Sequence, residues 1–186
     1  MNDGPLYDTE LRRLLAEREI SRVLARYVRG VDRVDLPLVA SCYHVDATDL
    51  HGTFEGNVEE FITWLGKLLR RYTMTMHHLG HSLVDWGDAE DEARVETYGV
   101  SVHRSPGDDP SGSLLIGFRY LDLFRRKPVD GVPQWRIQRR VCTTEWIRTD
   151  DADGRFPIGE RFLQGSRDGT DLVQQPWEAL FDEHAR

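Results

Sequence analysis

Two side chains that stand far apart in the chain, Asp32 and His77, are of the types that make a general base in enzymes. A neutral imidazole accepts a proton well near neutral pH, and a carboxylate on its other ring nitrogen fixes the tautomer and the orientation of the ring. A base held in this way accelerates a reaction by ~10²–10⁴-fold. The pair therefore indicates proton removal from a small molecule, provided that the fold brings the two side chains together.

Asp32 falls at the end of a predicted helix that begins near residue 8. Apolar residues recur along this segment with the i, i+3, i+4, i+7 spacing of a helix that lies on a core. They are Leu11, Leu14, Leu15, Ile20, Val23, Leu24, Tyr27, Val28 and Val31. A second, short helix is predicted after Asp35, and a third between Asn57 and about Arg71, with Asn57 as its N-cap.

His77 falls near the start of the first of four long predicted strands. From Thr75 onward the spacing of apolar residues changes to two, which is typical of strands. The predicted strands are 75–86, 92–104, 113–127 and 134–148, and a shorter β segment precedes them at 47–54. Helices followed by long antiparallel strands predict the α+β class, with a cone-shaped, curved antiparallel sheet that the N-terminal helices cover.

The predicted domain ends at about residue 150. Residues 1–150 hold all of the predicted helices and strands and make up the α+β barrel domain. Residues 151–186 are rich in Gly, Asp and Arg, and we expect an extended C-terminal tail that packs on the domain or on a neighbouring subunit. Phe156, Phe162 and Trp177 are its candidate anchors.

Strand alternation predicts which side chains share a face of the sheet. One set is His77, Leu79, His81 and Leu83 in the first long strand, and another is Arg140, Cys142, Thr144 and Trp146 in the last. Each face mixes polar with apolar side chains, whereas a purely structural sheet would separate them. We expect a pocket with polar groups on the concave side of the sheet.

The composition excludes several classes of function. With 24 basic and 32 acidic side chains, the net charge of −8 argues against a nucleic-acid surface. The chain has no run of 18 apolar residues that would predict a membrane span, and its first residues do not predict a signal peptide. Cys42 and Cys142 form neither a metal-binding motif nor a disulfide framework. We expect a cytoplasmic protein that needs no cofactor.

A zinc site is the main rival interpretation of the histidines, because His77 and His81 are four residues apart. On a helix this spacing would place both rings on one face. In a strand, four residues span ~13 Å, which is too far for both rings to bind one ion at ~2.0–2.1 Å. The strand pattern therefore argues against a metal site.

Four segments together resemble the SnoaL-like family of the nuclear transport factor 2-like superfamily: Ile20–Asp32, Thr75–Leu83, Val95–Arg104 and Trp135–Trp146. The resemblance extends over residues 8–150 and weakly into Gly165–Asp168. It implies a cystatin-like cone of curved sheet closed by the N-terminal helices.

The chain looks most similar to the scytalone dehydratase, hexachlorocyclohexane dehydrochlorinase and bile-acid 7α-dehydratase enzymes of that superfamily. These enzymes remove a proton with a His–Asp dyad while a leaving group departs. The resemblance implies that Asp32 and His77 form the dyad, that Tyr27 points into the cavity as a candidate acid, and that Arg140 faces the pocket to stabilise a developing anion. His81 stands where the family often has Asn, so the substrate class can differ.

Further residues are candidates for substrate binding: Tyr98, His103, Trp64, His81, Phe118 and Trp146. Tyr98 is also an alternative acid. The aromatic side chains favour a hydrophobic small molecule as the substrate. Each assignment has a structural alternative: Asp32 as a helix cap, Tyr27 as a core residue with a satisfied hydroxyl, and His77 as an ordinary strand histidine.

We therefore expect a cofactor-independent lyase or isomerase that performs a dehydratase-like β-elimination. Two alternatives remain at this stage. One is a non-catalytic module that binds a small ligand, or a partner subunit that resembles the β subunit of ring-hydroxylating dioxygenases. The other is a polyketide cyclase. Apolar residues on both faces of the 113–127 strand favour a homo-oligomer, with a trimer ahead of a dimer.

Overall fold

The computed structural model of the protein describes residues 4–87, 89–107, 112–150, 163–174 and 176. Its helices are α1 (Gly4–Arg33), α2 (Leu36–Ser41) and α3 (Val58–Leu69), with a short 3-10 helix, η2 (Leu172–Gln174). Its strands are β1 (Tyr43–His51), β2 (Phe54–Asn57), β3 (Met74–Trp86), β4 (Glu92–Arg104), β5 (Ser113–Val129) and β6 (Val132–Asp150). Within these residues no helix is both long and apolar enough to span a membrane.

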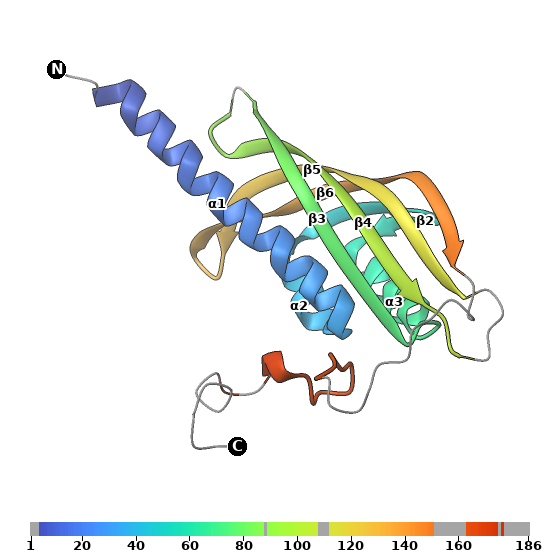
Figure 1. The fold of residues 1–186 in the computed structure, drawn as a ribbon. Coiled ribbons are helices and arrows are strands. Elements are labelled where there is room, and N and C mark those ends of the chain that lie inside the picture. Colours follow the sequence, from blue (N-terminus) through green and yellow to red (C-terminus); the bar gives the residue numbers. More distant parts are fainter. Residues whose placement is uncertain (1–3, 88, 108–111, 151–162, 175, 177–186) are drawn as a thin grey trace.

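The strands form one curved sheet in the order β2-β1-β6-β5-β4-β3, with helices on its concave side (Figure 1). The predicted α+β class is confirmed, but the sheet is mixed because β1 pairs in parallel with β6. Parallel neighbours need a long crossover connection, and the segment from β2 to β5 supplies it here. The sequence pattern gives strands but no directions, so this one pairing could not be read from it.

Helix α1 covers the sheet with its C-terminal half only. Ile20, Val23 and Tyr27 are buried there, as the helical spacing predicts. The helix begins at Gly4, before the predicted start, and its first half extends beyond the sheet (Figure 1). Leu14 is consequently 63% exposed, and the prediction that it lies on the core is wrong.

The corner between α1 and α2 fixes the position of Asp32 in the last turn of α1. The chain turns at Val34, whose φ of 56° is left-handed, and the N–H of Asp35 donates to the carbonyl of Gly30 at 2.8 Å. Gly30 allows this close approach, because a Cβ there would lie 2.8 Å from Val39 Cγ2. The Asp35 carboxylate caps α2 by accepting from the Leu38 N–H at 3.0 Å. Asp32 is therefore not the N-cap of α2.

Strand β3 carries His77 and contains an irregularity that changes which residues face inward. The pairing of β3 with β4 shifts between Leu79 and Ser82, so the alternation does not continue across Gly80. Ser82 then lies inward, where its hydroxyl is 2.9 Å from that of Thr97. The prediction that His81 shares a face with His77 is wrong, because His81 lies in the segment where the strand pairing shifts and is exposed.

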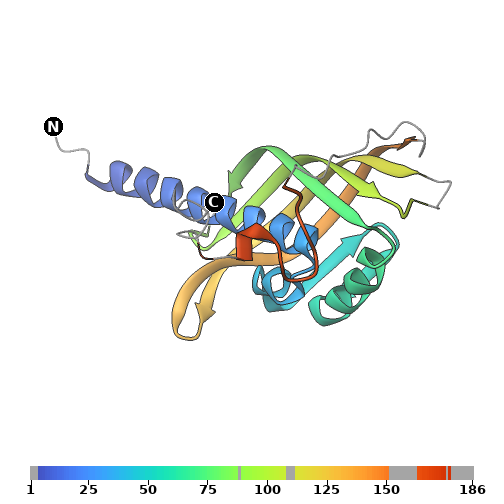
Figure 2. The same cartoon turned by 60° about the horizontal axis from the view of Figure 1, so that its bottom comes forward.

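Residues 163–174, called here the C-terminal strap, pack beside the end of α1 (Figure 2). Asp171 forms an ion pair with Arg33 at 2.9 Å, and the carbonyl of Val173 accepts from Arg29 at 3.3 Å. The side chain of Arg167 donates to the carbonyl of Tyr72 at 2.6 Å, just before β3. The strap thus bridges α1 and the start of β3. The candidate anchors Phe156, Phe162 and Trp177 lie outside the described residues.

Candidate active site

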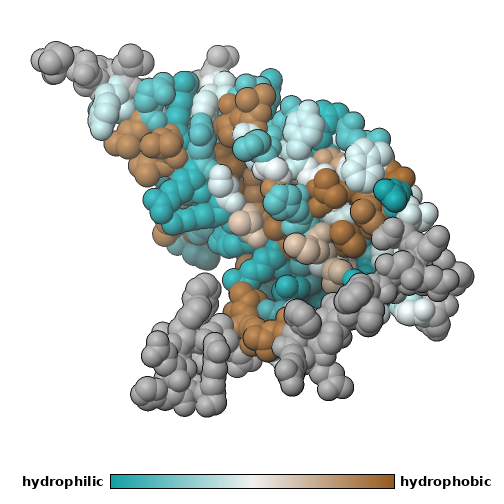
Figure 3. Space-filling model, in the orientation of Figure 1, coloured by the Kyte–Doolittle hydropathy of each residue, from teal (hydrophilic) through white to brown (hydrophobic). Residues whose placement is uncertain are grey.

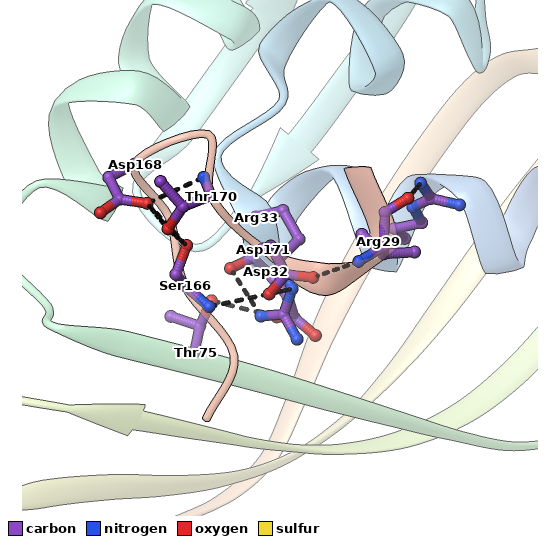
Figure 4. Close-up of polar contacts among 9 residues, drawn as sticks. Arg29, Asp32, Arg33, Thr75, Ser166, Asp168, Thr170 and Asp171 are labelled. Carbon is purple, nitrogen blue, oxygen red and sulfur yellow. Dashed lines mark hydrogen bonds and ion pairs between the residues drawn. The ribbon is translucent and has the colours of Figure 1, made fainter. Parts of the chain in front are cut away.

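Asp32 and His77 meet between the end of α1 and the start of β3. His77 Nδ1 lies 2.7 Å from Asp32 Oδ1, and the backbone N–H of His77 donates to Asp32 Oδ2 at 2.9 Å. The hydroxyl of Thr75 donates to Asp32 Oδ1 at 3.0 Å. The two side chains are only 8% (His77) and 13% (Asp32) exposed. One carboxylate therefore holds both the ring and the backbone of His77, and Figure 4 shows it next to Thr75.

This geometry assigns the ring nitrogens of His77. A carboxylate accepts only, so Nδ1 carries a hydrogen and Nε2 keeps the lone pair in the neutral ring. Within the part of the chain that the structure describes, Nε2 has no hydrogen bond and is not sealed from solvent. The arrangement is that of a general base with its accepting atom open.

Two predicted substrate-binding residues surround His77. The ring of His103 lies 5.4 Å from the His77 ring at 79°, and the ring of Phe118 lies 6.0 Å away at 66°. Tyr72 packs on the other side of His103 at 4.9 Å. Burial, aided by the positive charge of a protonated His77, lowers the pKa of His103 to about 4. His103 is therefore neutral at pH 7, and the wall around His77 is aromatic and uncharged on this side.

The buried, neutral His103 has a consequence for stability in acid. The unfolded chain binds a proton at this residue near pH 6.5, whereas the folded chain does so only near pH 4. Its contribution to the free energy of unfolding is thus fully present above pH 6.5 and is lost as the pH falls toward 4. We expect His103→Gln to reduce the loss of unfolding free energy between pH 7 and pH 4.5 by ~2 kcal/mol, measured by urea denaturation at both pH values.

The matched control for this measurement is His78→Gln, which removes an exposed histidine from the opposite face of β3. It should leave the difference between the two pH values as in the wild-type chain. A pH dependence in His103→Gln equal to that of wild type would contradict the assignment.

Tyr27 and Arg140, the other two predicted catalytic residues, meet each other deep in the core. The Arg140 guanidinium lies 4.2 Å from the centre of the Tyr27 ring and 3.8 Å from that of Tyr120. It also forms two hydrogen bonds of 2.7 Å with the carboxylate of Asp122, and both partners of this ion pair are fully buried. Burial raises the pKa of Tyr27, so its hydroxyl stays protonated. The charge of Arg140 is paired with Asp122 through Nε and Nη2, and its Nη1 is buried without a hydrogen-bond partner among the described residues.

The sequence did not predict a second polar cluster, which lies on β1. The hydroxyl of Tyr43 donates to Asp49 Oδ2 at 2.6 Å, and His51 Nδ1 lies 3.5 Å from Asp49 Oδ1. Burial opposes a charged His51, but its interactions with Asp49 and Cys142 prevail and raise its pKa to about 9. Asp49 and His51 alternate on one face of β1, which was the available signal. Tyr43 lies on the same strand, whereas Cys142 comes from β6 and Tyr120 from β5, and these pairings are not revealed by the sequence.

Two residues predicted to bind substrate lie on the outer face of the sheet instead. Tyr98 is 57% exposed and stands between the inward Thr97 and Gly99, and Trp146 is 48% exposed. The register of β5 and β6 shifts between Gly117 and Phe118, which moves Trp146 outward over Gly117. Both residues line a shallow groove of about 310 Å³ on that face. The strand alternation placed Tyr98 correctly, and its assignment to the pocket does not fit this position.

The last of the predicted substrate-binding residues also lies away from His77. Trp64, on α3, packs against the rings of His51, Phe54 and Phe61 and is half-buried. Trp86 lines an open groove of about 650 Å³ between the first half of α1 and the far end of the sheet. No cluster of three or more His, Cys, Asp or Glu side chains with metal-binding geometry occurs in the described residues.

Comparison with known proteins places this geometry in a family. A sequence profile of the SnoaL-like domain matches residues 12–141, which is more than half of the chain. A search of curated proteins gave no match.

Solved structures share the fold at low identity. A candidate scytalone dehydratase from Novosphingobium aromaticivorans is 22% identical, with a TM-score of 0.64 over 78% of this chain and 98% of that one. The hexachlorocyclohexane dehydrochlorinase LinA-type3 from Novosphingobium barchaimii is 18% identical, with a TM-score of 0.67 over 81% of this chain and 99% of that one.

A protein of unknown function with a cystatin-like fold from Nostoc punctiforme is 19% identical, with a TM-score of 0.54 over 70% of this chain and 92% of that one. These likenesses show the fold, and the profile shows the family. The chain belongs to the SnoaL-like family, with the fold of the nuclear transport factor 2-like proteins.

Proposed function

We propose that the protein is a cofactor-independent lyase or isomerase that removes a proton from a hydrophobic small molecule. The observation that carries the proposal is the 2.7 Å contact between His77 Nδ1 and Asp32 Oδ1, which leaves Nε2 open as a proton acceptor. A base held in this way contributes ~10²–10⁴-fold to the rate of proton transfer.

The proposed reaction is a dehydratase-like β-elimination. Nε2 of His77 takes a proton from a carbon next to an electron-withdrawing group, and the released electron pair forms a double bond. The leaving group departs from the neighbouring carbon with its bonding electrons. Asp32 stabilises the imidazolium that forms, because its carboxylate remains 2.7 Å from the ring. Without a leaving group, return of the proton to another carbon completes an isomerisation.

The surroundings of His77 support a hydrophobic substrate with a polar group. Phe118 offers an apolar surface, and the neutral His103 does not compete for the proton. His103 offers one ring nitrogen, Nε2, because its Nδ1 lies 3.5 Å from the hydroxyl of Ser101. The folds of a candidate scytalone dehydratase and of a dehydrochlorinase add support from proteins whose names describe eliminations. Because Tyr27 is buried against Arg140, we assign no acid to it in this proposal.

The test is a panel of cyclic compounds with an activated C–H next to a hydroxyl or halide, incubated with the protein in D₂O. We expect mass spectrometry to detect loss of water or hydrogen halide, or deuterium at the activated carbon, with His77→Gln inactive. Binding of panel members without either product would refute the enzyme and indicate a ligand-binding module. Equal activity in His77→Gln would refute the assigned base.

We also propose a homotrimer, with a dimer as the alternative. Its support is the set of exposed apolar side chains on the outer face of the sheet, where brown residues gather in Figure 3. The exposed apolar and aromatic side chains on the outer face include Met76, Leu83, Tyr98, Val100 and Trp146. Sedimentation equilibrium should give three times the mass of the 21.5 kDa chain, and a monomer at micromolar concentration would contradict the proposal.

A further inference from the structure

The C-terminal strap lies beside Asp32, although it follows the segment that the family profile covers. Figure 4 shows Ser166 and Asp171 of the strap next to Asp32 and Thr75. The ion pair of Asp171 with Arg33 joins the strap to the residue that follows Asp32. The strap therefore borders the site on the side of α1.

Several hydrogen bonds lie within the strap itself. Asp168 accepts hydrogen bonds from the hydroxyls of Ser166 and Thr170, and these bonds lower its pKa to about 2. Asp171 accepts from the N–H groups of Ser166 and Val173. Both carboxylates are thus engaged within the strap or with Arg33, and neither is paired with Arg167.

Among the described strap residues, Arg167 is the one whose buried side-chain nitrogens lack a hydrogen-bond partner. Its Nη1 donates to the carbonyl of Tyr72 at 2.6 Å, whereas Nε and Nη2 are sealed from solvent and have no partner among the described residues. A buried donor without a partner costs free energy, and the cost is larger for a charged group. An unpartnered face of a guanidinium is therefore a mark of an absent acceptor.

The position of this guanidinium follows from its neighbours. Tyr72, to which Arg167 donates, packs on the ring of His103, and His103 packs on His77. The charge of Arg167 acts on both Asp32 and His103. Asp32 accepts three hydrogen bonds from Thr75 and His77, and none of the hydrogen bonds among the described residues joins it to Arg167 Nε or Nη2.

We infer that Arg167 is an anion-binding residue of the site, and that Nε and Nη2 bind the oxygens of a carboxylate, phenolate or enolate on a hydrophobic ligand. Arg and a carboxylate match in a planar, two-bond geometry that Lys cannot reproduce. The resemblance assigns the anion contact to Arg140, but its charge is already paired with Asp122 through Nε and Nη2 and only Nη1, in the fully buried core, has no partner among the described residues. The link to catalysis rests on the proposed function, whereas the binding itself does not.

The experiment compares two probes of the same shape, 2-naphthoate and its uncharged analogue 2-naphthamide, by isothermal titration calorimetry. We expect the wild-type chain to bind 2-naphthoate at least ~10-fold more tightly than 2-naphthamide, and Arg167→Gln to bind the two within ~2-fold of each other. Arg167→Lys should retain a part of the preference, since it keeps the positive charge but cannot form two parallel hydrogen bonds with a carboxylate.

The matched control is Arg148→Gln, which makes the same change of charge at an exposed position on β6 and should keep the full preference. Equal affinities for the two probes in wild type, binding of neither, or a preference that survives in Arg167→Gln would each overturn the inference. The D₂O panel on the wild-type chain separates the two proposals. A wild-type chain that shows the Arg167-dependent preference but gives no product with the panel would leave the anion site standing and the proposed reaction refuted.

Discussion

Replacement of Asp32 by Asn is expected to lower kcat/KM by ~10²–10⁴-fold, about as much as loss of the base itself in His77→Gln. The carboxylate accepts from the ring N–H and the backbone N–H of His77 and from the hydroxyl of Thr75. An amide offers one oxygen and one NH₂ group, which would face a donor of His77. The ring would then turn or change its tautomer, and its open nitrogen would no longer be the acceptor.

Thr75→Val is the matched control for this prediction. It removes one of the three donors to Asp32 without touching the ring, so we expect it to keep kcat/KM within ~10-fold of wild type. The measurement is initial-rate kinetics on a compound found with the D₂O panel, with far-ultraviolet circular dichroism to establish folding. A folded Asp32→Asn chain with the kcat/KM of wild type would remove Asp32 from the proposed mechanism.

The largest expected loss of stability comes from Asp122→Asn, which should lower the free energy of unfolding by ~3–5 kcal/mol. Asp122 and Arg140 are fully buried and joined by two hydrogen bonds of 2.7 Å. The variant leaves the Arg140 charge in a low-dielectric core between the rings of Tyr27 and Tyr120, without its counter-ion. Urea denaturation monitored by tryptophan fluorescence measures the change.

Two further variants test whether the loss of stability comes from the unpaired, buried charge of Arg140. The double variant Asp122→Leu with Arg140→Met removes both charges and should recover much of the loss, since apolar replacement of a whole buried pair is often neutral. Asp46→Asn breaks the half-exposed pair with Lys127 and should cost less than ~1 kcal/mol. A loss for Asp122→Asn as small as that for Asp46→Asn would contradict the buried-pair account.

The parts of the fold that follow from local patterns could be predicted from the sequence. The spacing of Ile20, Val23 and Tyr27 gave the buried face of α1, and Asn57 with Glu60 forms the capping box that opens α3. The position of Asp32 near the end of α1 and of His77 near the start of β3 followed from these elements. Their contact was implied by the family resemblance, because no local pattern links residues 45 positions apart.

The rest depends on how strands meet, which a single sequence does not encode locally. Alternation holds only while the register is continuous, and the shifts after Leu79 and after Gly117 moved His81 and Trp146 off the predicted face. Arg140 points inward as expected, but its partner Asp122 comes from the opposite position on β5, and only the pairing of β5 with β6 reveals it. Arg167 lies in the expected C-terminal tail and in the weak extension of the resemblance, but no pattern around it predicts a role in the site.

The two hydrogen bonds from His77 to Asp32 imply that the imidazole is held in its reactive orientation before a ligand binds. The carboxylate of Asp32 accepts hydrogen bonds from both the ring N–H and the backbone N–H of His77. The backbone bond fixes the position of the carboxylate, so rotation of the ring would break its own short hydrogen bond to Asp32. The ring therefore has little rotamer freedom left to lose when a ligand arrives, and the entropic cost of forming the reactive complex falls mainly on the ligand. On this view, selectivity would be governed by how rigid an incoming molecule already is.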